Sequence, residues 1–190
     1  MDTVRTRRWS RAEYECLIDK GVFRPGERLE LVGGELVVRE PQRALHATAI
    51  ELALDALKEA FGPGWRVRIQ LPVALDDESE PEPDVAVAPG GAREYLPSHP
   101  AQPALIVEVA DTTLAFDREQ KGSLYARARI ADYWIVNLVD RVLEVYRNPA
   151  PASGAAHGWR YTSVATLRTG DLVSPLAARH ARISIADLLP

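Results

Sequence analysis

The sequence predicts a mixed α/β fold, in which a central mixed β-sheet is flanked by helices and preceded by an N-terminal helix and a β-hairpin. Residues 85–88 and 104–109 are apolar on both faces, as expected for central strands that are covered on each side. Residues 43–61 carry apolar side chains on one helical face. Residues 65–75 alternate between apolar and polar, which is the period of a strand with one solvated face. Because no composition shift interrupts this series, we expect a single domain over residues 1–190.

Three elements are expected in the first third of the chain. Ser10 begins a capping-box pattern, which predicts a short helix that ends at Gly21. Residues 29–38 form two short apolar segments around a diglycine turn, which is typical of a β-hairpin. The long helix at 43–61 is followed by Gly-Pro-Gly at 62–64, which cannot continue it.

The later elements follow the same reasoning. We expect the two fully apolar segments to lie side by side as central strands. A helix is predicted at 114–128, and a last short helix begins at Ser184. Further strands are predicted at 133–138, 141–147 and 159–164, with a loop at 148–158.

Charge and composition restrict the class of function. The formal net charge of −4 argues against a protein that coats nucleic acid by bulk electrostatics, so contact with DNA needs a local basic patch. The arginines near the N-terminus could form one, although a solvated terminus is the preferred interpretation. These arginines are Arg5, Arg7, Arg8 and Arg11.

The expected location is the cytoplasm. Cys16 is the only cysteine, which excludes an intrachain disulfide and a zinc site built from cysteines. The sequence starts without the apolar segment of a signal peptide, and no run of about 20 apolar residues could span a bilayer. We therefore expect no membrane partner.

Two carboxylates in the expected central strands are the candidates for a metal site. Glu108 interrupts a strand otherwise suited to burial, and a buried carboxylate needs a cation. Asp84 follows an extended Pro-Glu-Pro segment and begins an apolar strand. Two carboxylates on neighbouring strands can share one Mg²⁺ and leave room for water and a phosphate. A salt-bridged core glutamate is the alternative for Glu108.

Lys121 is expected on the inward face of the helix at 114–128. It shares the apolar face with Leu124 and Tyr125. It also follows Asp117 by one helical turn, so a structural i,i+4 ion pair and a functional role are both open. The acidic run at 76–80 is interpreted instead as a solvated turn.

The set Pro83-Asp84, Glu108 and a later lysine resembles the PD-(D/E)XK nuclease superfamily. In that superfamily the lysine commonly stands two residues after the glutamate. Ala110 holds this position here, on the same strand face as Glu108, so Lys121 would have to replace the usual lysine.

A longer series of residues is similar to the Uma-type family of restriction endonucleases over nearly the whole chain. The series is Arg28-Leu29-Glu30-Leu31-Val32-Gly33-Gly34-Glu35, His46, Pro83-Asp84-Val85, Leu105-Ile106-Val107-Glu108-Val109, Asp117, Lys121, Tyr125 and Asp132-Tyr133-Trp134-Ile135-Val136. The resemblance implies a restriction-endonuclease-like core, within which Tyr133 and Trp134 are expected to be buried.

The resemblance also implies an activity and its residues. Asp84 and Glu108 would bind Mg²⁺, with Mn²⁺ as a substitute, and Lys121 would assist the attack of water on a phosphodiester of DNA. Glu35 or His46 would contribute to the site. A surface glutamate of the hairpin and an ordinary histidine at a helix start are the alternatives for these two residues.

Two other functions stay open. The first is a catalytically inactive protein that keeps the nuclease fold for binding or assembly, which the net acidity and Ala110 favour. The second is a metal-dependent hydrolase of a smaller phosphoester, because one fold supports many activities. Cleavage of a duplex often uses two sites, so a homodimer fits the nuclease hypothesis.

Overall fold

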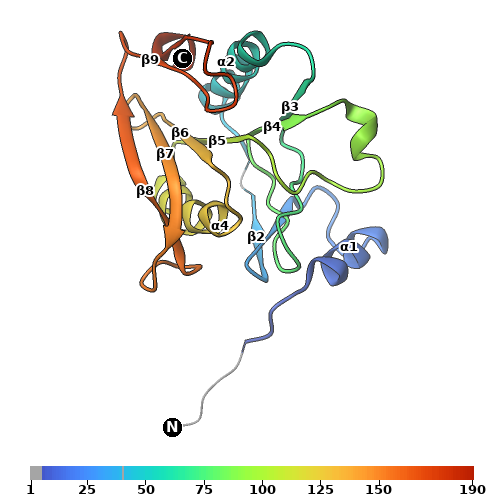
Figure 1. The fold of residues 1–190 in the computed structure, drawn as a ribbon. Helices are drawn as coiled ribbons and strands as arrows, with labels where there is room; N and C mark the ends of the chain where they lie inside the picture. Colours follow the sequence, from blue (N-terminus) through green and yellow to red (C-terminus); the bar gives the residue numbers. More distant parts are fainter. Residues whose placement is uncertain (1–5, 40) are drawn as a thin grey trace.

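The computed structural model describes residues 6–39 and 41–190, and its main feature is a six-stranded mixed sheet (Figure 1). The strand order is β3-β4-β5-β6-β7-β8, and only β5 and β6 run parallel. The strands are β3 (Trp65–Ile69), β4 (Val85–Pro89), β5 (Leu105–Ala110), β6 (Asp132–Asn137), β7 (Val142–Pro151) and β8 (Trp159–Leu167). The predicted mixed α/β fold is therefore confirmed, with β4 and β5 side by side.

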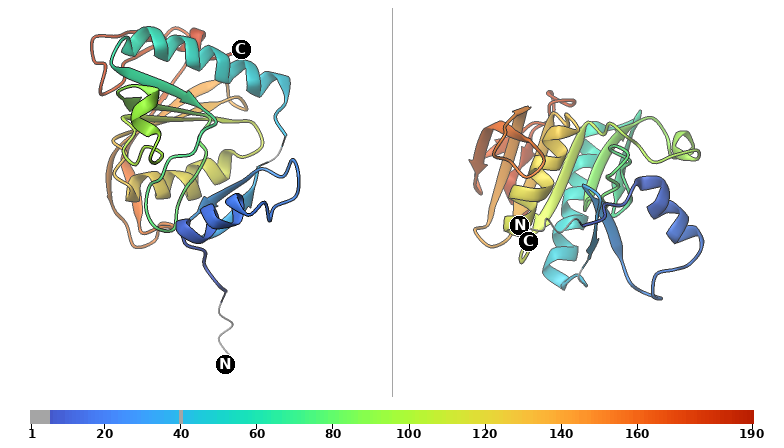
Figure 2. Two further views of the ribbon diagram at one scale, coloured as in Figure 1. Left: turned by 90° about the vertical axis from the view of Figure 1, so that its right-hand side faces the viewer. Right: turned by 90° about the horizontal axis from the view of Figure 1, so that it is seen from below.

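Helices cover the two faces of this sheet (Figure 2). The helix α2 (Ala44–Phe61) packs on one face, where its apolar side chains join a cluster with Val85, Val107 and Trp134. The helix α4 (Gly122–Arg127) packs on the other face. Successive strand residues point to opposite faces, so Glu108 shares the α4 face with Ala110. The alternation along β5 therefore decides which helix can reach Glu108.

The N-terminal elements form as predicted. The helix α1 (Arg11–Asp19) begins after Ser10, whose side chain accepts a hydrogen bond from the N–H of Glu13 in a capping box. The strands β1 (Leu29–Val32) and β2 (Glu35–Val38) pair as an antiparallel hairpin. Both glycines of its turn have positive φ angles, 56° and 83°, which glycine adopts most easily.

Three boundaries differ from the prediction. The strand predicted at 65–75 ends at Ile69, because Gln70 has a φ of 50° and turns the chain out of the sheet. The helix predicted at 114–128 is divided into α3 (Leu114–Phe116), the π-helical turn η2 (Asp117–Lys121) and α4. The strand β7 extends to Pro151, into the predicted loop, because β8 pairs with it over that length.

The acidic run at 76–80 is solvated only in part. Asp77 and Glu78 are exposed, as predicted. Glu80 is buried, because its backbone forms a bridge with Leu31 of β1 and this holds the segment against the hairpin. The interpretation of the whole run as solvent-facing is therefore wrong for Glu80.

Short elements complete the chain. They are η1 (Ala92–Tyr95), β9 (Leu172–Val173), β10 (Ile183–Ser184) and η3 (Ile185–Asp187). The predicted last helix is the single 3-10 turn η3, with Ser184 as its cap. The C-terminal residues Ile185 and Leu188 pack in the cluster under α2. Over the described ranges, the search for a membrane-crossing helix finds none of sufficient length and apolar character.

Candidate active site

A cavity of about 300 Å³ lies beside the adjoining ends of β4 and β5. Its wall is formed by the hairpin, the start of α2, the loop after β5 and the turn η2. The charged residues that line it are Arg28, Glu30, Arg39, Arg43, His46, Asp84, Glu108, Asp111, Asp117 and Lys121. Four of the five predicted site residues thus meet at one place: Asp84, Glu108, Lys121 and His46.

The sheet register brings Asp84 and Glu108 together. Val85 pairs with Val107 in the antiparallel β4–β5 ladder, so the next residues along, Asp84 and Glu108, stand opposite each other. The Asp84 N–H donates to Glu108 Oε2 at 3.3 Å, and the Val109 N–H donates to Asp84 Oδ2 at 2.9 Å. Both side chains are buried, with residue exposures of 3% and 2%.

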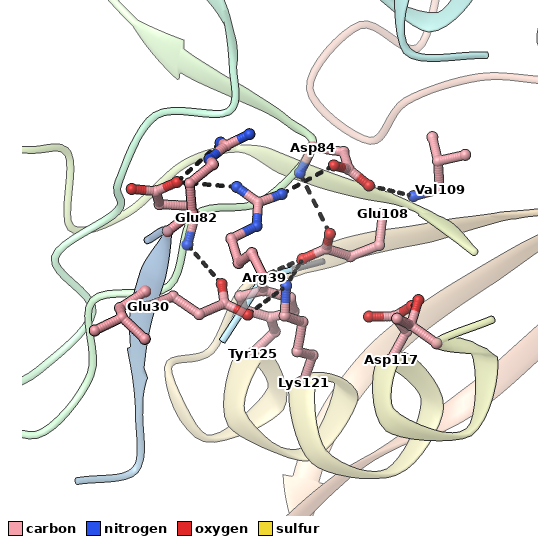
Figure 3. Close-up of polar contacts among 12 residues, drawn as sticks. Glu30, Arg39, Glu82, Asp84, Glu108, Val109, Asp117, Lys121 and Tyr125 are labelled. Carbon is pink, nitrogen blue, oxygen red and sulfur yellow. Dashed lines mark hydrogen bonds and ion pairs between the residues drawn. The ribbon is translucent and has the colours of Figure 1, made fainter. Parts of the chain in front are cut away.

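Lys121 reaches Glu108 from η2, as Figure 3 shows. Its Nζ lies 3.0 Å from Glu108 Oε1 and 3.1 Å from Glu30 Oε1. The Tyr125 hydroxyl donates to the same Glu108 oxygen at 2.7 Å. Glu108 is therefore both a salt-bridged core residue and a cavity residue, which joins the two interpretations left open by the sequence.

The i,i+4 ion pair between Asp117 and Lys121, one of the two roles left open for this lysine, is not among the ion pairs of the described residues. The wider π-helical turn between them replaces the α-helical spacing. The Asp117 carboxylate instead accepts a hydrogen bond from the Thr113 hydroxyl at 2.6 Å. Lys121 pairs instead with Glu30 and Glu108.

Glu30 is a site residue that the sequence reasoning missed. Its Oε2 accepts a hydrogen bond from the Glu82 N–H at 2.9 Å, while its Oε1 contacts Lys121. Glu35, the predicted acid of the hairpin, is exposed at the start of β2 and is not part of the cavity wall. One feature of the sequence could have revealed Glu30 as a site residue. It lies between Leu29 and Leu31, in a strand that is buried almost throughout.

His46 and Arg39 surround Asp84. His46 Nε2 lies 3.2 Å from Asp84 Oδ2, and an Arg39 nitrogen lies 3.2 Å from Oδ1. Burial lowers the pKa of His46, but the close approach and negative charge of Asp84 outweigh this, so the pKa is raised. Burial alone would raise the pKa of Asp84. The contact with His46 outweighs burial, so the pKa of Asp84 is lowered. Asp84 is thus held ionised by its neighbours.

Acidic side chains outnumber the cations in contact with them. Four carboxylates are buried here, while Lys121 and Arg39 supply the permanent positive charges that contact them. Burial and Asp84 raise the pKa of Glu108, although Lys121 opposes this shift. The carboxylates are Glu30, Asp84, Glu108 and Asp117. Such a site favours the entry of a further cation.

The carboxylates of the cavity can supply some of the ligands of a Mg²⁺ ion. Carboxylate oxygens are the ligands this ion prefers, and it usually takes one or two of them together with water and phosphate oxygens. Asp84 and Glu108 supply two such groups at the cavity. No cluster of three or more His, Cys, Asp or Glu side chains that could enclose a metal is found in the described ranges. The residues therefore fit an ion that shares its coordination with solvent and substrate.

Of the four N-terminal arginines, the three that the structure describes do not line this cavity. Arg7 pairs with Glu13, Arg8 donates to the Gly33 carbonyl, and Arg11 pairs with Glu15; Arg5 lies outside the described residues. The arginines that do line the cavity flank the two strands of the hairpin. They are Arg28, Arg39 and Arg43.

The six-stranded mixed sheet with helices on both faces is a restriction-endonuclease-like fold, in which Asp84 and Glu108 face each other where β4 begins and β5 ends. The Uma2 family, described as "Putative restriction endonuclease", matches residues 11–186. The chain therefore belongs to the Uma2 family.

A solved structure supports the assignment of the fold. It is the crystal structure, at 1.96 Å resolution, of "a putative nuclease belonging to DUF820" from Anabaena variabilis ATCC 29413. The TM-score is 0.63 at 16% sequence identity, and the match covers 85% of this chain and 89% of that one. At this sequence identity, the comparison supports the assignment of the fold alone. A search of curated proteins gives no match to the chain.

Proposed function

We propose that this chain is a Mg²⁺-dependent endonuclease that hydrolyses phosphodiester bonds of DNA. The observation that carries the proposal is the pair Asp84 and Glu108, opposed by the sheet register, with the Lys121 ammonium 3.0 Å from Glu108. The description of the Uma2 family supports the same reaction class. Mn²⁺ should substitute for Mg²⁺, because both accept carboxylate and water ligands.

Each residue has a role that follows from its contacts. Asp84 and Glu108 would hold the metal ion. When bound, that ion stabilises negative charge on the phosphate and lowers the pKa of a bound water. Tyr125 fixes the Glu108 carboxylate through its 2.7 Å hydrogen bond. Lys121, held between Glu108 and Glu30, would orient the attacking water or neutralise the phosphate.

The basic cavity wall would receive the substrate. Arg28, Arg39 and Arg43 line the cavity and form the local patch that a chain of net charge −4 needs for DNA contact. Arg39 already contacts Asp84 and Glu82, so its guanidinium lies directly beside the acids. We expect these arginines to contact phosphate oxygens, because guanidinium groups bind them with two parallel hydrogen bonds.

The test is cleavage of supercoiled plasmid with Mg²⁺, with Mn²⁺ and with a chelator. The parent should nick the plasmid only with metal, whereas Asp84→Asn, Glu108→Gln and Lys121→Met should not. Exposed residues provide matched controls: Asp77→Asn, Glu119→Gln and Lys58→Met should keep the parent rate. Activity that survives in the three site variants would refute the assigned site, and a parent inactive on plasmid with either metal would refute the proposal.

One observation favours a second candidate, a hydrolase of smaller phosphoesters. The reacting groups are buried and the cavity volume, about 300 Å³, suits a ligand of modest size. The same variants assayed on bis(p-nitrophenyl) phosphate separate the two functions. A parent that hydrolyses this ester but leaves plasmid intact would favour the second candidate.

A further inference from the structure

The two carboxylate oxygens of Asp84 have different partners. Oδ2 accepts a hydrogen bond from the Val109 N–H at 2.9 Å and lies 3.2 Å from His46 Nε2. Within the described ranges, the polar partner of Oδ1 is one Arg39 nitrogen, at 3.2 Å. The backbone of β5 fixes Oδ2, whereas a long side chain alone holds Oδ1. Oδ1 is therefore the Asp84 oxygen that a metal ion can take, if Arg39 leaves it.

The Glu108 carboxylate is also held unequally. Its Oε1 has two partners, the Lys121 ammonium at 3.0 Å and the Tyr125 hydroxyl at 2.7 Å. Its Oε2 accepts a hydrogen bond from the Asp84 N–H at 3.3 Å, which is longer than the usual range. Each carboxylate oxygen can accept two such contacts, so Oε2 has room for a metal ion. The oxygens open to an ion are thus Oδ1 of Asp84 and Oε2 of Glu108, which face each other across the β4–β5 ladder.

Arg39 holds the position of a cation at this pair of acids (Figure 3). Its guanidinium bridges Asp84 Oδ1 at 3.2 Å and Glu82 Oε2 at 2.9 Å, and its side chain is only 12% exposed. Burial lowers the pKa of Arg39, but the negative charges of the surrounding acids, Glu108 foremost, outweigh this and raise it. The guanidinium therefore already balances the acids to which a metal ion would bind.

We propose that Arg39 and the metal ion compete for Asp84 Oδ1, and that the displaced Arg39 binds the substrate phosphate. The inference rests on the metal site of the proposed function. Glu82 can hold one guanidinium nitrogen while the other leaves Asp84. The backbone of Arg39 is fixed, because its N–H donates to the Arg28 carbonyl at 2.9 Å. The released nitrogen keeps the charge and the donors that bind phosphate oxygens, so Arg39 turns to the substrate only after the ion has taken its carboxylate.

Calorimetric titration with Mn²⁺ measures the competition. An adjacent guanidinium weakens the binding of a proton to an aspartate by about 10- to 1000-fold, and a divalent cation meets the same repulsion. Arg39→Met should therefore bind Mn²⁺ at least about tenfold more tightly than the parent.

Arg28→Met is the matched control for this titration. Arg28 lines the same cavity and also pairs with Glu82, at 3.3 Å, but its side chain is 45% exposed and its recorded ion pair does not include Asp84. Its removal should change the Mn²⁺ affinity by less than about threefold, because solvent screens an exposed charge.

Two further measurements separate competition from damage to the site. Arg39→Gln removes the charge but keeps an amide donor for Glu82, so it should also tighten Mn²⁺ binding, and circular dichroism melting checks that both variants fold. At saturating Mn²⁺, Arg39→Met should cleave supercoiled plasmid at least about tenfold more slowly than the parent, because it lacks a donor to the phosphate. Tighter metal binding together with slower cleavage identifies the exchange, since a damaged site would lose both.

The outcomes distinguish this proposal from the endonuclease proposal. Mn²⁺ binding that is unchanged or weaker in the folded Arg39 variants would overturn the competition, and undiminished cleavage by them would overturn the role at the phosphate. A parent that leaves plasmid intact, with tighter Mn²⁺ binding in the variants, would refute the endonuclease and support the competition. If neither the parent nor the variants bind Mn²⁺, the metal site and this proposal are both wrong.

Discussion

Glu80→Gln should stabilise the protein at pH 8 and much less at pH 5. Glu80 is 3% exposed, and its Oε2 has no hydrogen-bond partner among the described residues. The His99 ring lies close by, with Nε2 at 4.0 Å from Oε1, but burial lowers the pKa of His99, so this ring supplies no positive charge at pH 8. Burial, reinforced by Glu15, raises the pKa of Glu80 from 4.5 to about 7. The ionised form is therefore unfavourable in the folded protein.

The magnitude follows from the difference between the folded and unfolded pKa. The shift from 4.5 to about 7 corresponds to about 3 kcal/mol at 1.36 kcal/mol per pH unit. Because the folded pKa is raised, the protein loses this stability as pH rises from about 4.5 through 7. For a protein of this size, 1 kcal/mol changes the melting temperature by about 2–4 °C. Removing the charge should thus raise it by about 6–12 °C at pH 8.

Thermal unfolding followed by circular dichroism, at pH 5 and pH 8, measures this effect. Glu78→Gln is the matched control, because Glu78 is an exposed residue of the same run and should change little at either pH. A Glu80→Gln variant that melts lower than the parent at pH 8 would refute the reasoning, because it would show that the charged carboxylate is stabilised by a partner. An equal gain at both pH values would contradict the assigned titration.

Two further predictions concern the site and the hairpin. Lys121→Met should lower the free energy of unfolding, measured by urea denaturation, by about 3–5 kcal/mol, because it leaves two buried carboxylates without their shared cation. The control Lys58→Met, at an exposed lysine, should change this free energy by less than about 0.5 kcal/mol. Gly33→Ala should cost about 1–3 kcal/mol, because Gly33 has a φ of 56° and a Cβ there would lie 2.5 Å from a His157 ring carbon. Gly154→Ala, with open space around it, should be nearly neutral; equal losses at the two glycines would contradict the proposed clash.

Strand periodicity was enough to predict much of the site. Glu108 was recognisable because it interrupts an apolar strand and Asp84 because it stands at the start of one, and the antiparallel register places them opposite each other. The inward orientation of Lys121 was also predictable from the apolar face it shares with Tyr125. These inferences depend on local patterns and on the pairing of strands that follow each other in the chain. Both can be inferred from the sequence itself.

Long-range docking was not predictable in the same way. Glu30 and Glu35 lie on the same face of the hairpin, because Glu30 pairs with Val37 and Val32 pairs with Glu35. They differ in their place along the hairpin, and of the two only Glu30 lines the cavity. Which part of this face lines the cavity depends on how the hairpin docks, and the bridge that joins the hairpin to the later chain runs between Leu31 and Glu80, almost fifty residues apart. The same bridge buries Glu80, which in sequence looks like one more solvated acid. Neither outcome follows from the hairpin pattern alone, because that pattern does not specify where the hairpin contacts the rest of the chain.

Ala110, at the usual lysine position, and Lys121, on the helix, are structurally linked. Ala110 is fully buried on the Glu108 face, in the same packed cluster as Tyr125, whose hydroxyl binds Glu108. A small residue at 110 is what lets an aromatic ring pack over this face, and a lysine there would have to displace it. With the ring in place, a cation can reach Glu108 from the helix, and Lys121 does so at 3.0 Å. Ala110 therefore does not by itself indicate a lost catalytic group, which weakens the case for an inactive nuclease fold.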